Sequence, residues 1–240
     1  MEWTIIFLTT LFAGTVQGIT GFGAAIVIMC VLPYAMSLFE SQALANIVSM
    51  VINISLLVHY RKEVQWKQLV FPALFYFIGS TLSVNIAIGM DRVLLRRCFG
   101  VFLILLAAYF IFFGKKIHLK ENVPTLIACG LLAGFFEGAF GAGSGPVFVL
   151  YFMTVCPTRG SYIGTVQGCL LTGYIYLLFL RISKGIITEK SLLPAAVGVA
   201  GVVVGLLLAH AIGKRINDEA LRKVVYGMIT VSGLATILTA

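Results

Sequence analysis

The sequence predicts an all-α polytopic membrane protein with two duplicated halves, about 8–10 membrane segments and glycine-broken helices in each half. Three observations predict this class. Only 11% of the 240 residues are charged and 60% are hydrophobic, whereas a soluble domain carries roughly 25% charged residues. The charged residues gather in short clusters between long uncharged runs. The lengths of these runs repeat, in the same order, in the two halves of the chain.

The uncharged runs have the lengths of membrane-spanning helices. Their bounds are Trp3–Phe39, Ser41–Tyr60, Gln68–Met90, Cys98–Gly114, Asn122–Thr158, Gly160–Leu180, Ser191–Gly213 and Val224–Ala240. A spanning helix needs about 20 apolar residues, and these runs are apolar on all sides, unlike the alternating strands of a membrane barrel. Glu137 is the one charged residue inside a run. The pattern excludes a soluble enzyme, a disordered chain and a coiled coil.

The two halves match at an offset of 120 residues. The run lengths are 37, 20, 23 and 17, followed by 37, 21, 23 and 17. Four glycines correspond in each half, namely Gly14, Gly18, Gly21 and Gly23 with Gly134, Gly138, Gly141 and Gly143. We therefore expect an N-terminal transmembrane repeat over 1–120 and a C-terminal one over 121–240, together forming one membrane domain.

The two 37-residue runs must each break, because a single helix of that length would be about 55 Å long. The glycine clusters 18–23 and 138–146 mark the breaks. If each run crosses twice, there are ten crossings, both termini lie outside and the repeats are inverted; loop Lys and Arg totals of 11 and 6 favour this count. Single crossings would give eight, which stays open. Helix packing is the preferred interpretation of four other glycines, namely Gly14, Gly134, Gly201 and Gly205.

Broken helices inside a membrane present free N–H groups and a partial positive charge that attract anions. Our substrate-binding candidates at the two breaks are Thr20, Gly21, Gly23, Ala24, Gly141, Gly143, Ser144 and Gly145. Gln42, Asn46, Ser49 and Asn53 share one helical face, and we expect Asn46 and Asn53 to line the substrate path. Interhelical bonding explains such a stripe equally well. A second stripe is predicted at Thr165, Cys169, Thr172 and Tyr176, with Gln167 off its line.

Glu137 is the candidate coupling or gating residue, and Gln17 is its neutral counterpart in the first half. A carboxylate in the membrane costs about 2.5–3.5 kcal/mol or more and is a functional hypothesis by default. It would repel an anion unless it were protonated, which favours joint movement of proton and anion. A structural role beside the turn is the competing interpretation. Coupling to sodium is left open.

Other function classes receive no support from the sequence. The N-terminus lacks the basic segment and cleavage site of a signal peptide. The five cysteines stand singly, and we predict neither disulfides nor a metal site. The net charge of +8 indicates contact with anionic lipid and not with nucleic acid. No enzymatic motif is present, so we expect no enzyme and no cofactor. Assembly into a homo-oligomer is left open.

The repeated G-x-x-x-G-x-x-G-x-G element resembles the signature of the sulfite exporter TauE/SafE family, also called the toluene-sulfonate uptake permease group. The element Leu95-Arg96-Arg97-Cys98-Phe99-Gly100 is similar too. The sequence departs from the family pattern where Ala24, Ala25 and Ser144 replace or interrupt glycines, and in the positions of Pro33 and Pro146. The resemblance implies a permease for small anions such as sulfite, sulfonates or related organic acids.

The leading hypothesis is therefore a multi-pass secondary transporter in the plasma (inner) membrane that works by alternating access around the glycine turns. The alternatives are an anion channel without coupling, and a structural or intramembrane enzyme subunit.

Overall fold

The computed structural model describes residues 2–113, 121–212 and 218–239. The regular structure within these ranges is entirely helical, which confirms the predicted class. The predicted junction of the halves, at residues 120 and 121, adjoins the segment 114–120, which lies outside the described residues.

The helices form two sets, one in each half of the chain. The first comprises α1 (Glu2–Thr20), α2 (Ala24–Val31), η1 (Leu32–Tyr34), α3 (Leu38–Tyr60), α4 (Trp66–Gly89) and α5 (Arg92–Ala108), which continues as a π-helical turn, η2 (Tyr109–Phe113). The second comprises α6 (Val123–Phe140), α7 (Ser144–Val155), α8 (Arg159–Ser183), η3 (Glu189–Ser191), α9 (Leu192–Ile212) and α10 (Asp218–Thr239).

Polar residues between the apolar runs set where several helices begin. Ser37 and Glu40 form a reciprocal capping box at the start of α3, and the Asp91 carboxylate accepts two main-chain N–H bonds at the start of α5. Asn122 and Thr158 cap α6 and α8 in the same way. These side chains satisfy N–H groups that a helix leaves without partners in its first turn.

Seven described helices are long and apolar enough to cross a membrane, by length and composition. They are α1, α3, α4, α5 extended to Phe112, α6, α8 and α9. Their outer faces carry large apolar side chains, such as Phe71, Leu105 and Phe179, which are exposed by 59%, 64% and 67%. Such a surface suits contact with lipid rather than with water.

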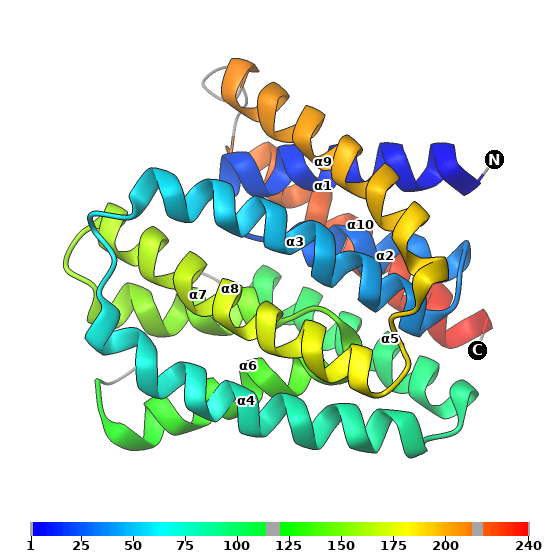
Figure 1. The fold of residues 1–240 in the computed structure, drawn as a ribbon, viewed down its shortest axis with the longest axis horizontal. Helices are drawn as coiled ribbons and strands as arrows, with labels where there is room; N and C mark the ends of the chain where they lie inside the picture. Colours follow the sequence, from blue (N-terminus) through cyan, green and yellow to red (C-terminus); the bar gives the residue numbers. More distant parts are fainter. Residues whose placement is uncertain (1, 114–120, 213–217, 240) are drawn as a thin grey trace.

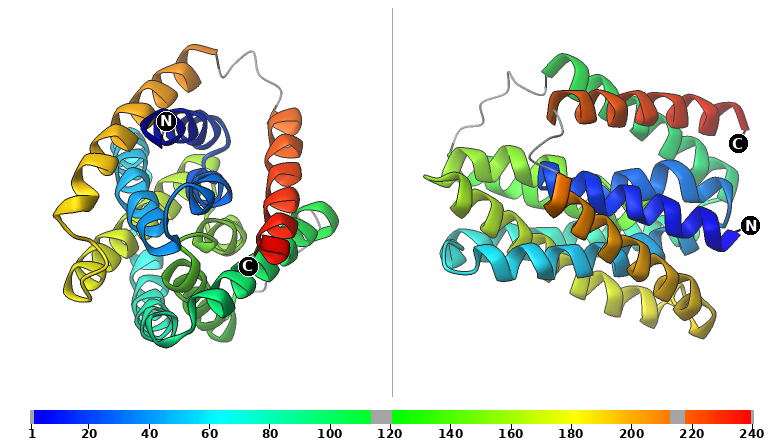
Figure 2. Two further views of the ribbon diagram at one scale, coloured as in Figure 1. Left: turned by 90° about the vertical axis from the view of Figure 1, so that its right-hand side faces the viewer. Right: turned by 90° about the horizontal axis from the view of Figure 1, so that it is seen from above.

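The helices pair across the two halves. α1 packs along α9 and α4 along α6, while α3 and α8 pack against each other and α5 packs against α10. Figure 2 shows α5 and α10 as a pair at one side of the molecule. Both described chain ends lie on the same side, at the right of Figure 1.

Glycines form the seams of the two closest pairs. An added Cβ at Gly14 would lie 2.7 Å from the carbonyl oxygen of Val202 on α9, and one at Gly134 would strike the carbonyl oxygen of Tyr76 on α4. Gly201 and Gly205 meet the main chain of α1 in the same manner. The predicted packing role of these four glycines is confirmed.

Gly18 and Gly138, which the sequence assigned to the breaks, also lie in these seams. An added Cβ at Gly18 would lie 2.6 Å from the Cβ of Ala209, and one at Gly138 would lie 2.7 Å from the carbonyl oxygen of Ser80. Their inclusion in the breaks was wrong, because both helices continue beyond them, to Thr20 and Phe140.

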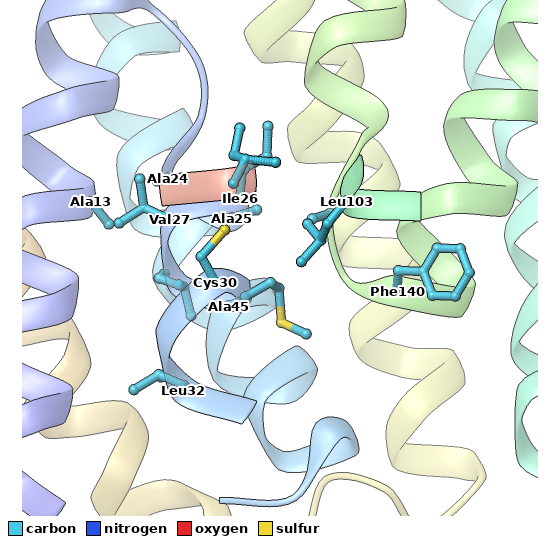
Figure 3. Close-up of a cluster of buried hydrophobic side chains, with 14 of the residues drawn as sticks. Ala13, Ala24, Ala25, Ile26, Val27, Cys30, Leu32, Ala45, Leu103 and Phe140 are labelled. Atoms are coloured by element: carbon cyan, nitrogen blue, oxygen red, sulfur yellow. The ribbon is translucent and has the colours of Figure 1, made fainter. Parts of the chain in front are cut away.

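The short helix α2 lies deep in the apolar core. All its residues from Ala24 to Cys30 are buried, and Figure 3 shows Ile26 and Cys30 among Ala13, Ala45, Leu103 and Phe140. The start of α2 is thereby held between helices of both halves.

Candidate functional site

Two short glycine turns interrupt the helices at corresponding positions of the two halves. Gly21 and Gly23 have φ of 85° and 109°, and Gly141 and Gly143 have φ of 69° and 113°. Glycine adopts these left-handed conformations at no steric cost. The chain thus leaves one helix at residue 20 or 140 and begins the next at residue 24 or 144.

Gln17 and Glu137 play the same part beside the two turns. The Gln17 side-chain oxygen accepts a hydrogen bond from the main-chain N–H of Ala24 (3.1 Å), and Glu137 Oε2 accepts one from that of Ser144 (3.2 Å). The Ser144 hydroxyl also donates to Glu137 Oε2, at 2.5 Å. Each side chain therefore accepts a hydrogen bond from the first main-chain N–H of the following helix. The partial positive charge at this end of the helix favours an anionic acceptor.

A glutamine from the opposite half holds each turn. Gln167 on α8 donates to the carbonyl oxygen of Gly21, and Gln42 on α3 donates to that of Ala139, both at 2.8 Å. The turns also approach one another, since an added Cβ at Gly145 would lie 3.6 Å from the Cβ of Phe22. The two turns and the central helices α3 and α8 consequently meet in one region.

Arg181, near the end of α8, is completely buried in this region. Its guanidinium donates to the carbonyl oxygen of Gln42 (3.1 Å), to Oδ1 of Asn46 (3.1 Å), to Oε1 of Gln42 (3.4 Å) and to the main-chain carbonyl oxygen of Glu137 (3.1 Å). These bonds fix the guanidinium between α3 and α6.

Arg181 is not among the predicted site residues. The charge pattern predicts Glu137 as the one charge inside the apolar segments and Arg181 as part of a loop cluster, and the burial of Arg181 corrects this. A signal was present, because Gln167, Tyr174 and Arg181 are spaced seven residues apart and so share one helical face. All three are buried. Of the predicted α8 stripe, Thr165 and Cys169 are buried, whereas Thr172 and Tyr176 are only partly so.

Two tyrosines extend the polar region around Glu137. The Tyr174 hydroxyl lies beside the Glu137 carboxylate and the Ser144 hydroxyl. Tyr76 on α4 interacts electrostatically with Glu137, Tyr174 and Arg181, and it is fully buried. We call the group Glu137, Ser144, Tyr174, Tyr76 and Arg181 the charged centre.

The predicted stripe on α3 joins the charged centre to the first turn. Gln42, Asn46, Ser49 and Asn53 are all buried. Asn46 accepts from Arg181 and donates to the carbonyl oxygen of Tyr174 (3.0 Å), while Asn53 Oδ1 accepts from Gln17 Nε2 (2.9 Å). Gln17, Asn53 and the N–H of Ala24 form a second cluster, which we call the neutral centre.

The remaining predicted site residues lie in the turns themselves. Thr20 donates its hydroxyl to the carbonyl oxygens of Val16 (2.8 Å) and Phe22 (2.7 Å), and so closes the first turn. Gly21 and Gly141 end α1 and α6, and Gly23 and Gly143 precede α2 and α7. The structure thus brings the predicted residues together as two polar clusters linked by α3.

Two sizeable cavities border this region on different sides. A polar one of about 620 Å³ is lined by residues that include Glu40, Arg92, Gly185 and Ile186. The N–H of Ile186 donates to the main-chain carbonyl oxygen of Arg181 (2.9 Å), so this cavity reaches the C-terminal end of α8. The other, of about 660 Å³, lies between α5 and the α6–α7 turn and is almost entirely apolar. No cluster of three or more His, Cys, Asp or Glu residues that could hold a metal occurs in the described part of the chain.

Comparisons with known proteins agree with this architecture. The model of the family described as "Sulfite exporter TauE/SafE" matches residues 6–236. The chain is 24% identical over 190 residues to "Probable membrane transporter protein MJ0441" of Methanocaldococcus jannaschii, covering 74% of this chain and 70% of that protein. It is 23% identical over 159 residues to "Probable membrane transporter protein YfcA" of Escherichia coli K12, covering 63% and 59% of the two chains. No solved structure matches the chain.

Apolar helices around a buried polar region, together with these relatives, define the class: a multi-pass membrane transporter. More particularly, the chain belongs to the sulfite exporter TauE/SafE family, as the match over nearly its whole length shows.

Proposed function

We propose that this protein is a secondary transporter for small anions of the class of sulfite, sulfonates and related organic acids, acting in the plasma (inner) membrane. The observation that carries this function is the charged centre, where a buried arginine, two tyrosines and a serine gather beside a glycine turn. Ionisable groups inside a membrane protein are costly and mark substrate or ion pathways.

Alternating access would follow from an inverted duplication, which we also propose for 1–120 and 121–240. In Figure 1, α1 runs from right to left and its counterpart α6 from left to right. The pairing of α1 with α9 corresponds to that of α6 with α4. Both observations support a two-fold relation in the membrane plane, the usual basis of rocking transporters.

Access to the charged centre is proposed from the polar cavity of about 620 Å³. It opens where α1, α3 and the loop after α8 meet, and it contains Glu2, Glu40 and Arg92. The loop carries the Ile186 N–H that bonds to Arg181. A small shift of this loop would expose the charged centre to water on that side.

Glu137 is proposed to couple anion movement to a proton. Its carboxylate holds the position at the start of α7 where an anionic ligand would itself be stabilised. An incoming anion and an ionised Glu137 therefore repel one another, and protonation removes the repulsion. Proton and anion would move together.

Transport assays in proteoliposomes test the proposal. We expect saturable uptake of sulfite, and acceleration of that uptake when the vesicles are preloaded with unlabelled sulfite, because a carrier exchanges its substrate. Passive flux that is neither saturable nor accelerated would identify a channel. A thermal-shift screen with sulfate, thiosulfate, sulfonates and carboxylates would then rank the substrates.

The glycine turns have their own test. We expect Gly21→Leu and Gly141→Leu to abolish anion binding, because each adds a side chain at a left-handed residue of a turn. Gly89→Leu is the control, since Gly89 is exposed at the end of α4, outside both turns, and nothing lies within 4 Å of its added Cβ. Unchanged binding in both turn variants would refute the glycine-turn mechanism.

A further inference from the structure

Arg181 carries a positive charge that no anionic group of the described residues contacts directly. Each of its four hydrogen bonds within the described residues goes to a neutral oxygen, from Gln42, Asn46 or the main chain of Glu137. Its Nε has no partner in this part of the chain. A buried charge without direct compensation is strongly unfavourable, so the position is explained best by a function that requires the charge.

The carboxylate of Glu137 carries the negative charge nearest to Arg181 among the described residues, but it binds Ser144 instead. Arg181 Nη2 binds the main-chain oxygen of Glu137, while the Glu137 carboxylate binds both the N–H and the hydroxyl of Ser144. The guanidinium and the carboxylate therefore lie in the same buried region without forming a bidentate pair. The arginine keeps a donor available for a second anion.

Tyr76 supplies another unused donor. Its hydroxyl is buried and has no partner among the described residues, and it lies within electrostatic range of Glu137, Tyr174 and Arg181. A buried hydroxyl without a partner costs about 1–3 kcal/mol. Among the five residues of the charged centre, the groups without partners in the described structure are Arg181 Nε and the Tyr76 hydroxyl. Both can donate, so a ligand that accepts hydrogen bonds would satisfy both.

We infer that Arg181 and Tyr76 form a recognition site for a compact oxyanion, and that the Glu137 carboxylate is the resident anion against which this ligand competes. The inference rests on the proposed function and assigns its recognition residues. The ionisable groups that surround Glu137 are Tyr174 and Arg181 from α8 and Tyr76 from α4, while α3 and α7 contribute the neutral Gln42, Asn46 and Ser144.

Calorimetric titration of the purified protein with sodium sulfite tests the arginine. We expect Arg181→Gln to weaken binding about 10- to 100-fold, the range of a lost hydrogen bond to a charged group, and Arg181→Lys to weaken it less. The matched control is Arg159→Gln, the same substitution at an exposed arginine at the start of α8, which should bind as the wild type does.

Tyr76→Phe tests the inference even if the arginine variants do not fold. Because the hydroxyl has no partner in the described structure, a purely structural tyrosine predicts equal or higher stability and unchanged sulfite binding. The inference predicts equal or higher stability with binding about 5- to 10-fold weaker. Unchanged affinity in a folded Tyr76→Phe variant would overturn the inference.

Glu137→Gln should change binding in the opposite direction. Removal of the competing carboxylate is expected to tighten the binding of methanesulfonate about 10-fold or more at neutral pH and to remove its pH dependence, because this ligand keeps its charge while a carboxylate titrates. Weaker binding would contradict the role of Glu137 as the resident anion. If the wild type binds neither sulfite nor methanesulfonate, the proposed function itself fails; if it binds them and these variants leave the affinity unchanged, this inference alone fails.

Discussion

At the residue scale, the two halves use one arrangement with different chemistry. Gln17 and Glu137 both accept the first N–H of the next helix, yet only one is charged. The neutral centre shows that an amide can hold a turn of this kind, so the hydrogen bond at the turn does not itself require the charge of Glu137.

Loss of Gln17 should reveal how much this arrangement stabilises the protein. Gln17→Leu leaves the Ala24 N–H and the Asn53 side chain buried without their partners. Because each such group costs about 1–3 kcal/mol, we expect a clear fall in the melting temperature of the detergent-solubilised protein. Asn85→Leu, a similar change at an exposed position of α4, is the control and should melt near the wild type. Equal melting of the two variants would show that the Gln17 bonds do not hold the turn.

The sequence predicted Gln17, Glu137 and the buried face of α3 because these residues interrupt apolar runs or repeat at a fixed offset. Arg181 was not predicted, because it directly follows an apolar run and lies three residues before Lys184. Hydropathy places a terminal arginine in a loop, while the structure extends α8 to Ser183 and turns the side chain inward to carbonyl oxygens of two other helices. Only the three-dimensional contacts decide between these outcomes.

At the element scale, glycine seams set how closely α1 approaches α9 and α4 approaches α6. The atoms opposite these glycines belong largely to the partner's main chain, as with Gly134 and Tyr76. A backbone cannot rotate aside as a side chain can, so even one methyl group must separate the helices.

Gly134→Ala should therefore destabilise the protein by about 1–3 kcal/mol, the range of overpacked contacts. Gly227→Ala is the matched control, because nothing lies within 4 Å of the position of its added Cβ. The control should be neutral or slightly stabilising, since alanine favours helix. Thermal unfolding in detergent measures both, and similar melting temperatures would contradict the seam.

The second turn offers a similar contrast between two glycines two residues apart. Gly143 has φ of 113°, and an added Cβ would lie 2.6 Å from Cζ of Phe102; at Gly145 the nearest atom, on Phe22, is 3.6 Å away. We expect Gly143→Ala to lower the melting temperature clearly and Gly145→Ala to change it little. If the melting temperature fell for Gly145→Ala but not for Gly143→Ala, the strain would not lie at Gly143.

The glycine spacing identified both turns, because only glycine suits their left-handed residues. It did not separate Gly18 and Gly138, whose neighbours on α9 and α4 lie about 190 and 60 residues away in the sequence. Contacts at such distances leave no local pattern. The spacing also gave no lengths for the returning helices, which are 8 residues for α2 and 12 for α7.

At the scale of the whole molecule, the pairing of helices across the halves places both turns beside the central helices α3 and α8. Each half supplies the glutamine that holds the other's turn, so movement of one half must affect both turns. The match of run lengths predicted two related halves. It could not specify which helix of one half packs against which helix of the other, because packing depends on the side chains along each helix face and not on helix length.

The number of crossings was left open between eight and ten for a physical reason. Hydropathy reports the length of an apolar run, and it is silent on whether the chain reverses at a glycine turn. The position of both described ends on one side in Figure 1 agrees with an even number of crossings, which both counts share.

Sulfite uptake into proteoliposomes under an imposed proton gradient tests whether Glu137 couples the anion to a proton. We predict that the wild-type protein takes up sulfite faster when the outside is more acidic, and that Glu137→Gln still exchanges sulfite but no longer responds to the gradient. Wild-type uptake equal to that of protein-free vesicles, or uptake by Glu137→Gln that responds to the gradient as the wild type does, would contradict the account.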